Sequence, residues 1–137
     1  MSGGSKRPKK GDETTATRVR RVEQSVREEV SSLVASGLKD PRAAGAVVTR
    51  VQMGSDLRIA RIYVRLLEDA ENVGRRHEVV EALRRAAGVL RREVTHRLGL
   101  RYAPELRFEY DEGADHLTAV ERVLAEIAAD RKRSTDE

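Results

Sequence analysis

Apolar side chains recur every three or four residues in the first long segment of the chain, between Thr17 and Gly37. This spacing predicts an amphipathic helix, because positions three and four apart share one helical face. Thr17 is a suitable N-cap, and Asp40-Pro41 predicts a turn after the helix, since the residue before a proline is disfavoured in helical conformation. The apolar stripe consists of Val19, Val22, Val26, Val30 and Leu33.

The period changes to two between residues 46 and 67, with Gly54-Ser55-Asp56 between two alternating runs, which predicts a β-hairpin. The first run places Val47, Thr49, Val51 and Met53 on one side. The second run places Ala60, Ile62, Val64 and Leu66 on its apolar side. The opposite, basic face of the predicted hairpin carries Arg50, Arg61, Tyr63 and Arg65.

A second helical stripe runs from Val79 to Leu98 and is interrupted at Gly88. A glycine inside a helix costs about 1 kcal/mol relative to alanine, so we expect Gly88 to mark a kink between two helices. Residues 106–110 alternate as a third strand, and residues 117–127 carry the stripe of a last helix. The predicted order is helix, strand, strand, helix, kink, helix, strand and C-terminal helix. This is an α+β fold with helices on one face of a small sheet.

The length of 137 residues is that of one domain. Residues 1–16 lack apolar periodicity and are rich in Gly, Ser and Lys, which predicts a flexible basic arm. We expect a single domain over residues 17–129, including the C-terminal helix, and a flexible tail over residues 130–137.

The composition excludes several classes of protein. The chain has no cysteine, which rules out disulfides and thiolate chemistry. No apolar stretch approaches the ~20 residues that a membrane span needs, and the N-terminus has no apolar segment typical of a secretory signal. We therefore expect a soluble cytoplasmic protein that contacts no membrane.

Charge is distributed unevenly along the chain. Residues 72–98 contain seven basic and three acidic side chains, whereas residues 99–129 contain three basic and seven acidic ones. Of the 27 basic residues 22 are arginines, whose planar guanidinium binds phosphate through two parallel hydrogen bonds. A basic surface of this kind favours an anionic polymer as partner. A GC-rich genome that encodes arginine in place of lysine is the alternative explanation of the arginine count.

Candidate catalytic and metal-binding groups are sparse. Acidic side chains near the third strand (Glu109, Asp111, Glu112 and Asp115) are followed by His116. They could hold a divalent cation, but acids in the first turn of a helix account for most of them. No serine or threonine has an evident His and Asp partner. We expect no enzymatic activity, no metal and no cofactor.

Arginine pairs lie on both sides of three small residues in the second helical segment. Residues at i and i+7 are two helical turns apart, so Arg84 aligns with Arg91 and Arg85 with Arg92. Ala86, Ala87 and Gly88 between them carry no bulk that would keep a sugar-phosphate backbone away. These seven residues are the predicted RNA-binding site, to which the basic hairpin face adds. The alternative is a close helix crossing at Ala87 and Gly88, with the arginines merely solvated.

Several motifs in this order resemble those of the bacterial ribosome-binding factor A family, from about Arg18 to Ile127. The matching stretches are Arg18–Val22 (RVRRV), Lys39–Arg42 (KDPR), Val51–Leu66, Ala86–Arg91 (AAGVLR) and Leu100–Asp111 (LRYAPELRFEYD).

The resemblance implies a type II KH-like fold, with Ala86-Ala87-Gly88 in place of the Gly-x-x-Gly loop of ordinary KH domains. It also implies a non-enzymatic factor that binds 16S ribosomal RNA in the small (30S) ribosomal subunit, promotes late 16S processing and supports growth in the cold. We expect a monomer. Residues 111–114 lack the serine-containing turn usual in the family, which leaves the course of the C-terminal helix open. A module that docks a partner protein through its helices is the alternative function.

Overall fold

The computed structural model describes residues 14–136. Within the last helix, the side chains of residues 114–119 and 133–136 are outside this description. Residues 1–13 of the predicted arm also lie outside it, whereas residues 14–16 already belong to the first helix and its cap.

Helix α1 (Thr15–Ala35) packs one side against the sheet and begins earlier than its spacing predicted. Thr14 is the N-cap, and its side chain accepts a hydrogen bond from the Thr17 backbone N–H at 3.2 Å. The prediction that Thr17 caps the helix is therefore wrong: a threonine three residues upstream satisfies the same free N–H groups. The predicted stripe is confirmed at its centre, where Val26 and Val30 are fully buried.

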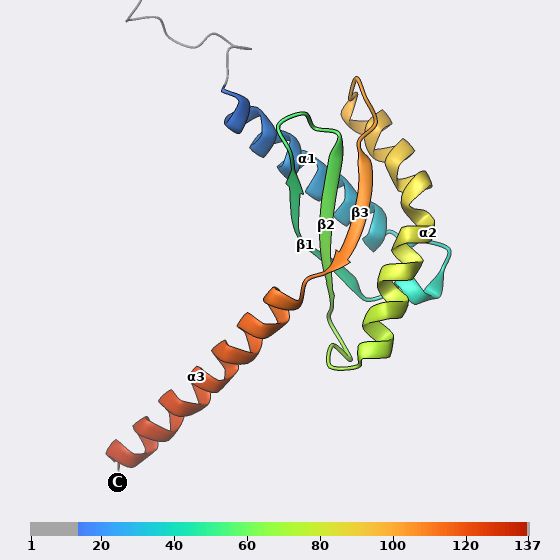
Figure 1. Ribbon diagram of the computed structural model, residues 1–137. Helices are drawn as coiled ribbons and strands as arrows, with labels where there is room; N and C mark the ends of the chain where they lie inside the picture. Colours follow the sequence, from blue (N-terminus) through green and yellow to red (C-terminus); the bar gives the residue numbers. More distant parts are fainter. Residues whose placement is uncertain (1–13, 137) are drawn as a thin grey trace, which may run out of the picture.

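Three strands form one sheet in the order β1-β2-β3. Strand β1 (Ala46–Met53) pairs antiparallel with β2 (Ile59–Leu66), and β2 pairs parallel with β3 (Glu105–Tyr110). Figure 1 shows β2 in the middle and β3 on the side of α2. The predicted inward side of β2 is confirmed by the burial of Ala60, Ile62, Val64 and Leu66.

Strand β1 departs from simple alternation. Val48 pairs with Val64 and Arg50 with Tyr63, so Thr49 is an extra residue in a β-bulge. A bulge moves the following side chains to the other face, and Val48 and Val51 are both buried as a result. The prediction that Val47, Thr49, Val51 and Met53 share one face is wrong for this reason.

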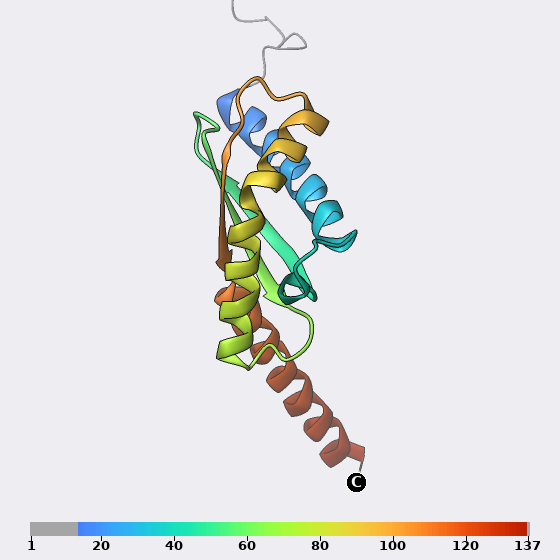
Figure 2. The same cartoon turned by 90° about the vertical axis from the view of Figure 1, so that its right-hand side faces the viewer.

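Helix α2 (Val73–Leu98) is one continuous helix that includes Gly88. It bows along its length in Figures 1 and 2 but is not divided, so the predicted pair of helices separated by a kink is wrong. The cost of one glycine is small beside the burial of Val79, Leu83, Leu90 and Val94 on a single face. The helix ends at the C-cap Gly99, which adopts the left-handed region with φ +62°.

Helix α3 (Glu112–Asp136) extends away from the domain. It continues through residues 130–136, which are helical in the structure where we predicted a flexible tail. Its described apolar side chains, Val120, Val123, Leu124 and Ile127, are exposed. The layer of helices on one face of the sheet is thus made by α1 and α2 (Figure 2). The opposite face carries polar and charged side chains. The α+β class is confirmed.

Candidate nucleic-acid interface

Four exposed arginines surround Gly88 on the outward face of α2. We call Arg84, Arg85, Gly88, Arg91 and Arg92 the arginine strip. Apart from the nearby backbone of α2 itself, no atom of the described residues lies within 4 Å of the position that a Cβ atom at Gly88 would occupy. The expected alignment of the two pairs is present, because all five residues lie on one continuous helix. A partner can therefore approach the backbone of α2 closely at Gly88, between guanidinium groups on both sides.

Arg84 and Arg91 have a second role that the sequence did not reveal. The Nε of Arg84 donates to the Phe108 carbonyl oxygen at 3.2 Å. Arg91 donates through Nε and Nη2 to the Ala103 carbonyl oxygen at 3.2 and 2.7 Å. These bonds connect α2 to β3 and to the loop before it, at the outer edge of the sheet. Each guanidinium has five N–H donors, so donors remain for a ligand.

The other line of the strip lies toward Asp40, which caps the short 3-10 helix η2 (Pro41–Ala43) before β1. Arg85 Nη2 is 3.4 Å from an Asp40 carboxylate oxygen, which also pairs with Arg42. Hydrogen bonds from Arg42, and a weaker one from Arg85, lower the pKa of Asp40 from 3.8 to about 2. Arg92 has no hydrogen bond or ion pair with any residue between 14 and 136 whose side chain is described. It is the least constrained cation of the strip.

Ala86 and Ala87 are partly buried and pack against the core, so they lie beneath the arginine strip and not on its surface. Ala87 also lines a groove of about 240 Å³ between α2 and β3. Its other walls are Arg84, Leu106, Arg107, Phe108 and Glu109. Sequence reasoning missed this groove and Arg107. The only signal was the position of Arg107 between two inward-facing residues of β3.

The hairpin face lies on the side of the sheet opposite α1 and α2. Arg61 is exposed and forms no ion pair or hydrogen bond within the described part of the chain. The Arg50 guanidinium lies 4.0 Å from the centre of the Tyr63 ring and also 3.7 Å from Asp111. One face of the Tyr63 ring is therefore already occupied, which leaves a single face for the expected stacking on a base. Arg65 is half-buried.

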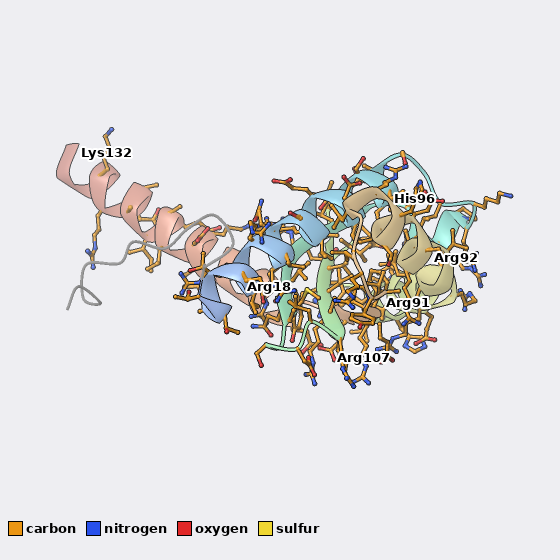
Figure 3. All side chains as sticks on the ribbon, turned by 90° about the horizontal axis from the view of Figure 1, so that it is seen from above. Arg18, Arg91, Arg92, His96, Arg107 and Lys132 are labelled. Atoms are coloured by element: carbon orange, nitrogen blue, oxygen red, sulfur yellow. The ribbon has the colours of Figure 1, made fainter. Side chains whose placement is uncertain are left out.

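Arg107 connects the two predicted surfaces, which lie on different sides of the domain. It is the register partner of Arg61 across β2 and β3, and it also lines the groove beside Arg84. Viewed from above, Arg107, Arg91 and Arg92 follow one another around the edge formed by β3 and α2 (Figure 3). Arg107 also pairs with Glu105 at 3.3 Å, which offsets part of the repulsion between Arg107 and Arg61.

The acidic residues near the end of β3 do not form a metal site among the described side chains. Asp111 is buried and accepts a hydrogen bond from the Thr49 hydroxyl at 2.5 Å, so it holds the bulge of β1. Asp115 and His116 of the candidate cluster lie outside the described side chains. Within the described helices, none is long and apolar enough to cross a bilayer.

Comparison with known proteins identifies the family. Residues 18–124 match the family described as ribosome-binding factor A. The chain is 43% identical over 110 residues to ribosome-binding factor A of Sorangium cellulosum, covering 80% of this chain and 88% of the relative. It is 36% identical over 118 residues to that of Clostridium novyi, covering 85% and 94%.

A solved structure supports the fold. The crystal structure of ribosome-binding factor A from Thermus thermophilus aligns with a TM-score of 0.56 at 23% identity, over 67% of this chain and 94% of that one. The KH-like fold expected from the resemblance is confirmed. The chain belongs to the ribosome-binding factor A family, which is not a family of enzymes.

Proposed function

We propose that this protein binds the small ribosomal subunit through 16S ribosomal RNA, as a monomer in the cytoplasm, and promotes late processing of that RNA, including during growth in the cold. Membership of a family named for ribosome binding supports the general activity. The choice of subunit and of process rests on the resemblance in the sequence. The RNA-facing residues are proposed to be the arginine strip, with Ala86 and Ala87 beneath it, and the hairpin face of Arg50, Arg61, Tyr63 and Arg65.

The proposal rests mainly on the open space around the exposed Gly88 and on the four arginines beside it. A helix gains nothing from glycine at an exposed position with open space around it, where alanine would be about 1 kcal/mol better. Four arginines on both sides supply donors for phosphate oxygens. Close approach of an RNA backbone accounts for both features, whereas the bonds that Arg84, Arg85 and Arg91 form within the fold account for these arginines but not for Gly88.

Co-sedimentation with purified ribosomal subunits tests the proposal. We expect the full-length protein to sediment with small subunits and not with large ones. Equal binding to both, or preference for the large subunit, would refute it. The role in processing is tested in cells that lack the gene: precursor 16S RNA should accumulate, most at low temperature, and the wild-type gene should restore maturation.

Docking of a partner protein is a second candidate, favoured by one observation. The exposed side chains of Val120, Val123, Leu124 and Ile127 give α3 an apolar stripe that no described residue covers. A complex formed by such a stripe would depend weakly on salt, whereas a complex with RNA phosphates weakens steeply as salt rises.

A further inference from the structure

The β1–β2 loop, the α2–β3 loop and the start of α1 lie at the same end of the domain (Figure 1). Side chains from these three segments line a second hollow. Its volume is about 90 Å³, well below the ~300–1,000 Å³ typical of small-ligand pockets, so a ligand would lie across its opening and not inside it. Its floor is apolar and its rim is charged. The lining residues are Arg18, Val22, Met53, Asp56, Leu57, Leu100, Arg101 and Tyr102.

Among the residues that line this hollow, Tyr102 is an exposed aromatic side chain. Its side chain is 74% exposed, although it is one of only four aromatic residues in the chain. Nothing in the described fold requires a tyrosine there, because the ring contributes nothing to the core and its hydroxyl has no hydrogen bond among the described residues. Leu57, on the facing loop, adopts the left-handed region with φ +57°, a strained conformation for a leucine, and it adds apolar surface beside the ring.

The charged rim has a defined pattern. The Arg101 guanidinium lies 5.5 Å from the centre of the Tyr102 ring. Arg18 makes no ion pair or hydrogen bond through its side chain with the described residues. Asp56 is held in place because its Oδ1 accepts the Arg58 backbone N–H at 3.2 Å. Arg18, Arg101 and Asp56, whose carboxylate also pairs with Arg58 at 4.0 Å, thus line the same hollow as the exposed Tyr102 ring.

We propose that this hollow binds one unpaired nucleotide of single-stranded RNA. The base stacks on Tyr102, Arg18 and Arg101 bind the flanking phosphates, and Asp56 accepts hydrogen bonds from the base. Stacking on an aromatic ring requires an unpaired base, which excludes a regular RNA helix as the ligand. A carboxylate accepts only from donors, so guanine, with N–H groups on both N1 and N2, fits better than uracil. The inference rests on the proposed RNA-binding function and adds a contact at the end of α2 beyond the arginine strip.

Fluorescence anisotropy of labelled pentaribonucleotides tests this site on the full-length protein. The probes are a run of five uridines and the same run with guanine at its centre. We expect the guanine probe to bind more tightly. Tyr102→Ala should weaken its binding about 5- to 160-fold, which corresponds to the ~1–3 kcal/mol of one stacked base. Tyr102→Phe, which keeps the ring, should bind as the wild type does. Asp56→Asn should remove the preference for guanine and leave uridine binding unchanged.

Leu67→Ala is the matched control, since Leu67 is also an exposed large side chain but follows β2 at the opposite end of that strand. It should bind both probes normally. Unchanged affinity of Tyr102→Ala for the guanine probe would overturn the site, and so would equal loss in Tyr102→Phe. If Tyr102→Ala weakened sedimentation with small subunits but not binding of either probe, the hollow would bind protein and not RNA. Failure of the wild-type protein to bind small subunits would refute the proposed function instead.

Discussion

Substitution of Gly88 should change stability and binding in opposite directions. Its backbone is ordinary helix and its surroundings are open, so Gly88→Ala should raise the free energy of unfolding by about 1 kcal/mol. The same methyl group should weaken binding to small subunits, because it stands where the RNA backbone approaches, and Gly88→Val should weaken it further. Strain at a kink plays no part, since α2 is continuous there.

Thermal melting and sedimentation on the same preparations measure both effects. Ser32→Ala, on the exposed side of α1, is the control and should leave binding unchanged. A Gly88→Ala protein that is more stable and binds subunits as well as the wild type would show that nothing approaches α2 at this point.

Arg92 allows a clean test of charge, whereas Arg84 and Arg91 do not. Arg92→Glu should alter stability by no more than about 0.5 kcal/mol, because the arginine has no partner in the described fold. It should weaken subunit binding and lower the magnitude of the log–log salt slope by about 0.7 to 0.9, which corresponds to one lost phosphate contact.

Arg84→Glu and Arg91→Glu should instead lower both binding and stability, since each arginine donates to a backbone carbonyl at the edge of the sheet. Urea unfolding beside the binding titration separates the two cases. Loss of stability in Arg92→Glu equal to that in Arg91→Glu would contradict this assignment.

Asp40 should make stability depend on pH only in strongly acidic solution. Its pKa in the folded protein is lowered from 3.8 to about 2, chiefly by Arg42. A lowered pKa stabilises the fold above the unfolded value, and this contribution is lost as the pH falls from about 4 through about 2. Asp40→Asn keeps an oxygen that can accept the Arg42 backbone N–H but removes the charge.

Urea unfolding of both proteins at pH 7, 4 and 2 measures this contribution. The difference between wild type and Asp40→Asn should be similar at pH 7 and 4 and should shrink toward pH 2. A difference that grows as the pH falls would mean that the carboxylate does not stabilise the fold.

At the scale of elements, the hydrophobic pattern correctly predicted those buried faces that depend only on the spacing of apolar residues within one strand or helix. The inward sides of β2 and β3 and the centre of α1 follow directly from spacings of two and of three to four. The bulge at Thr49 could not be predicted in this way, because it is held by Asp111, which is 62 residues away in sequence. The kink prediction failed because a propensity of about 1 kcal/mol was given more weight than the burial of a whole helical face.

In the candidate site too, features within one helix could be predicted from the sequence and contacts between elements could not. The alignment of the arginine pairs follows from helical geometry within one segment. Arg107, its proximity to Arg84 and the groove between α2 and β3 depend on how a helix packs against a strand, which no local pattern records. The hydrogen bonds from Arg91 to the Ala103 carbonyl oxygen are likewise tertiary contacts.

Helix α3 should be dispensable for the fold. Its described apolar side chains are exposed, and its junction is held by Asp111. A chain that ends at Gly113 should therefore unfold within about 0.5 kcal/mol of the full-length protein in urea. It should also keep most of its salt-dependent binding to small subunits. Loss of binding with no change in the remaining salt slope would favour the alternative function, docking of a protein on α3.

At the scale of the whole molecule, basic groups extend from Arg91 and Arg92 of the arginine strip to Arg107 around one edge of the domain (Figure 3). Arg107 is in turn the register partner of Arg61 on the hairpin face. The C-terminal part of the chain is more acidic, with seven acidic and three basic side chains over residues 99–129. This asymmetry should orient the protein as it approaches an RNA surface, since like charges repel and opposite charges attract over a Debye length of about 10 Å at 0.1 M salt.

The dissociation constant for purified small subunits, measured across a salt series, tests the central claim most directly. The proteins compared are the wild type and a double variant, Arg61→Glu with Arg92→Glu, which reverses one charge on each predicted surface. If both surfaces face RNA, the wild type should show a steep loss of affinity with salt, and the double variant should bind more weakly with a slope reduced by about 1.4 to 1.8. A double variant with unchanged affinity and slope would show that the RNA-binding surface lies elsewhere on the molecule.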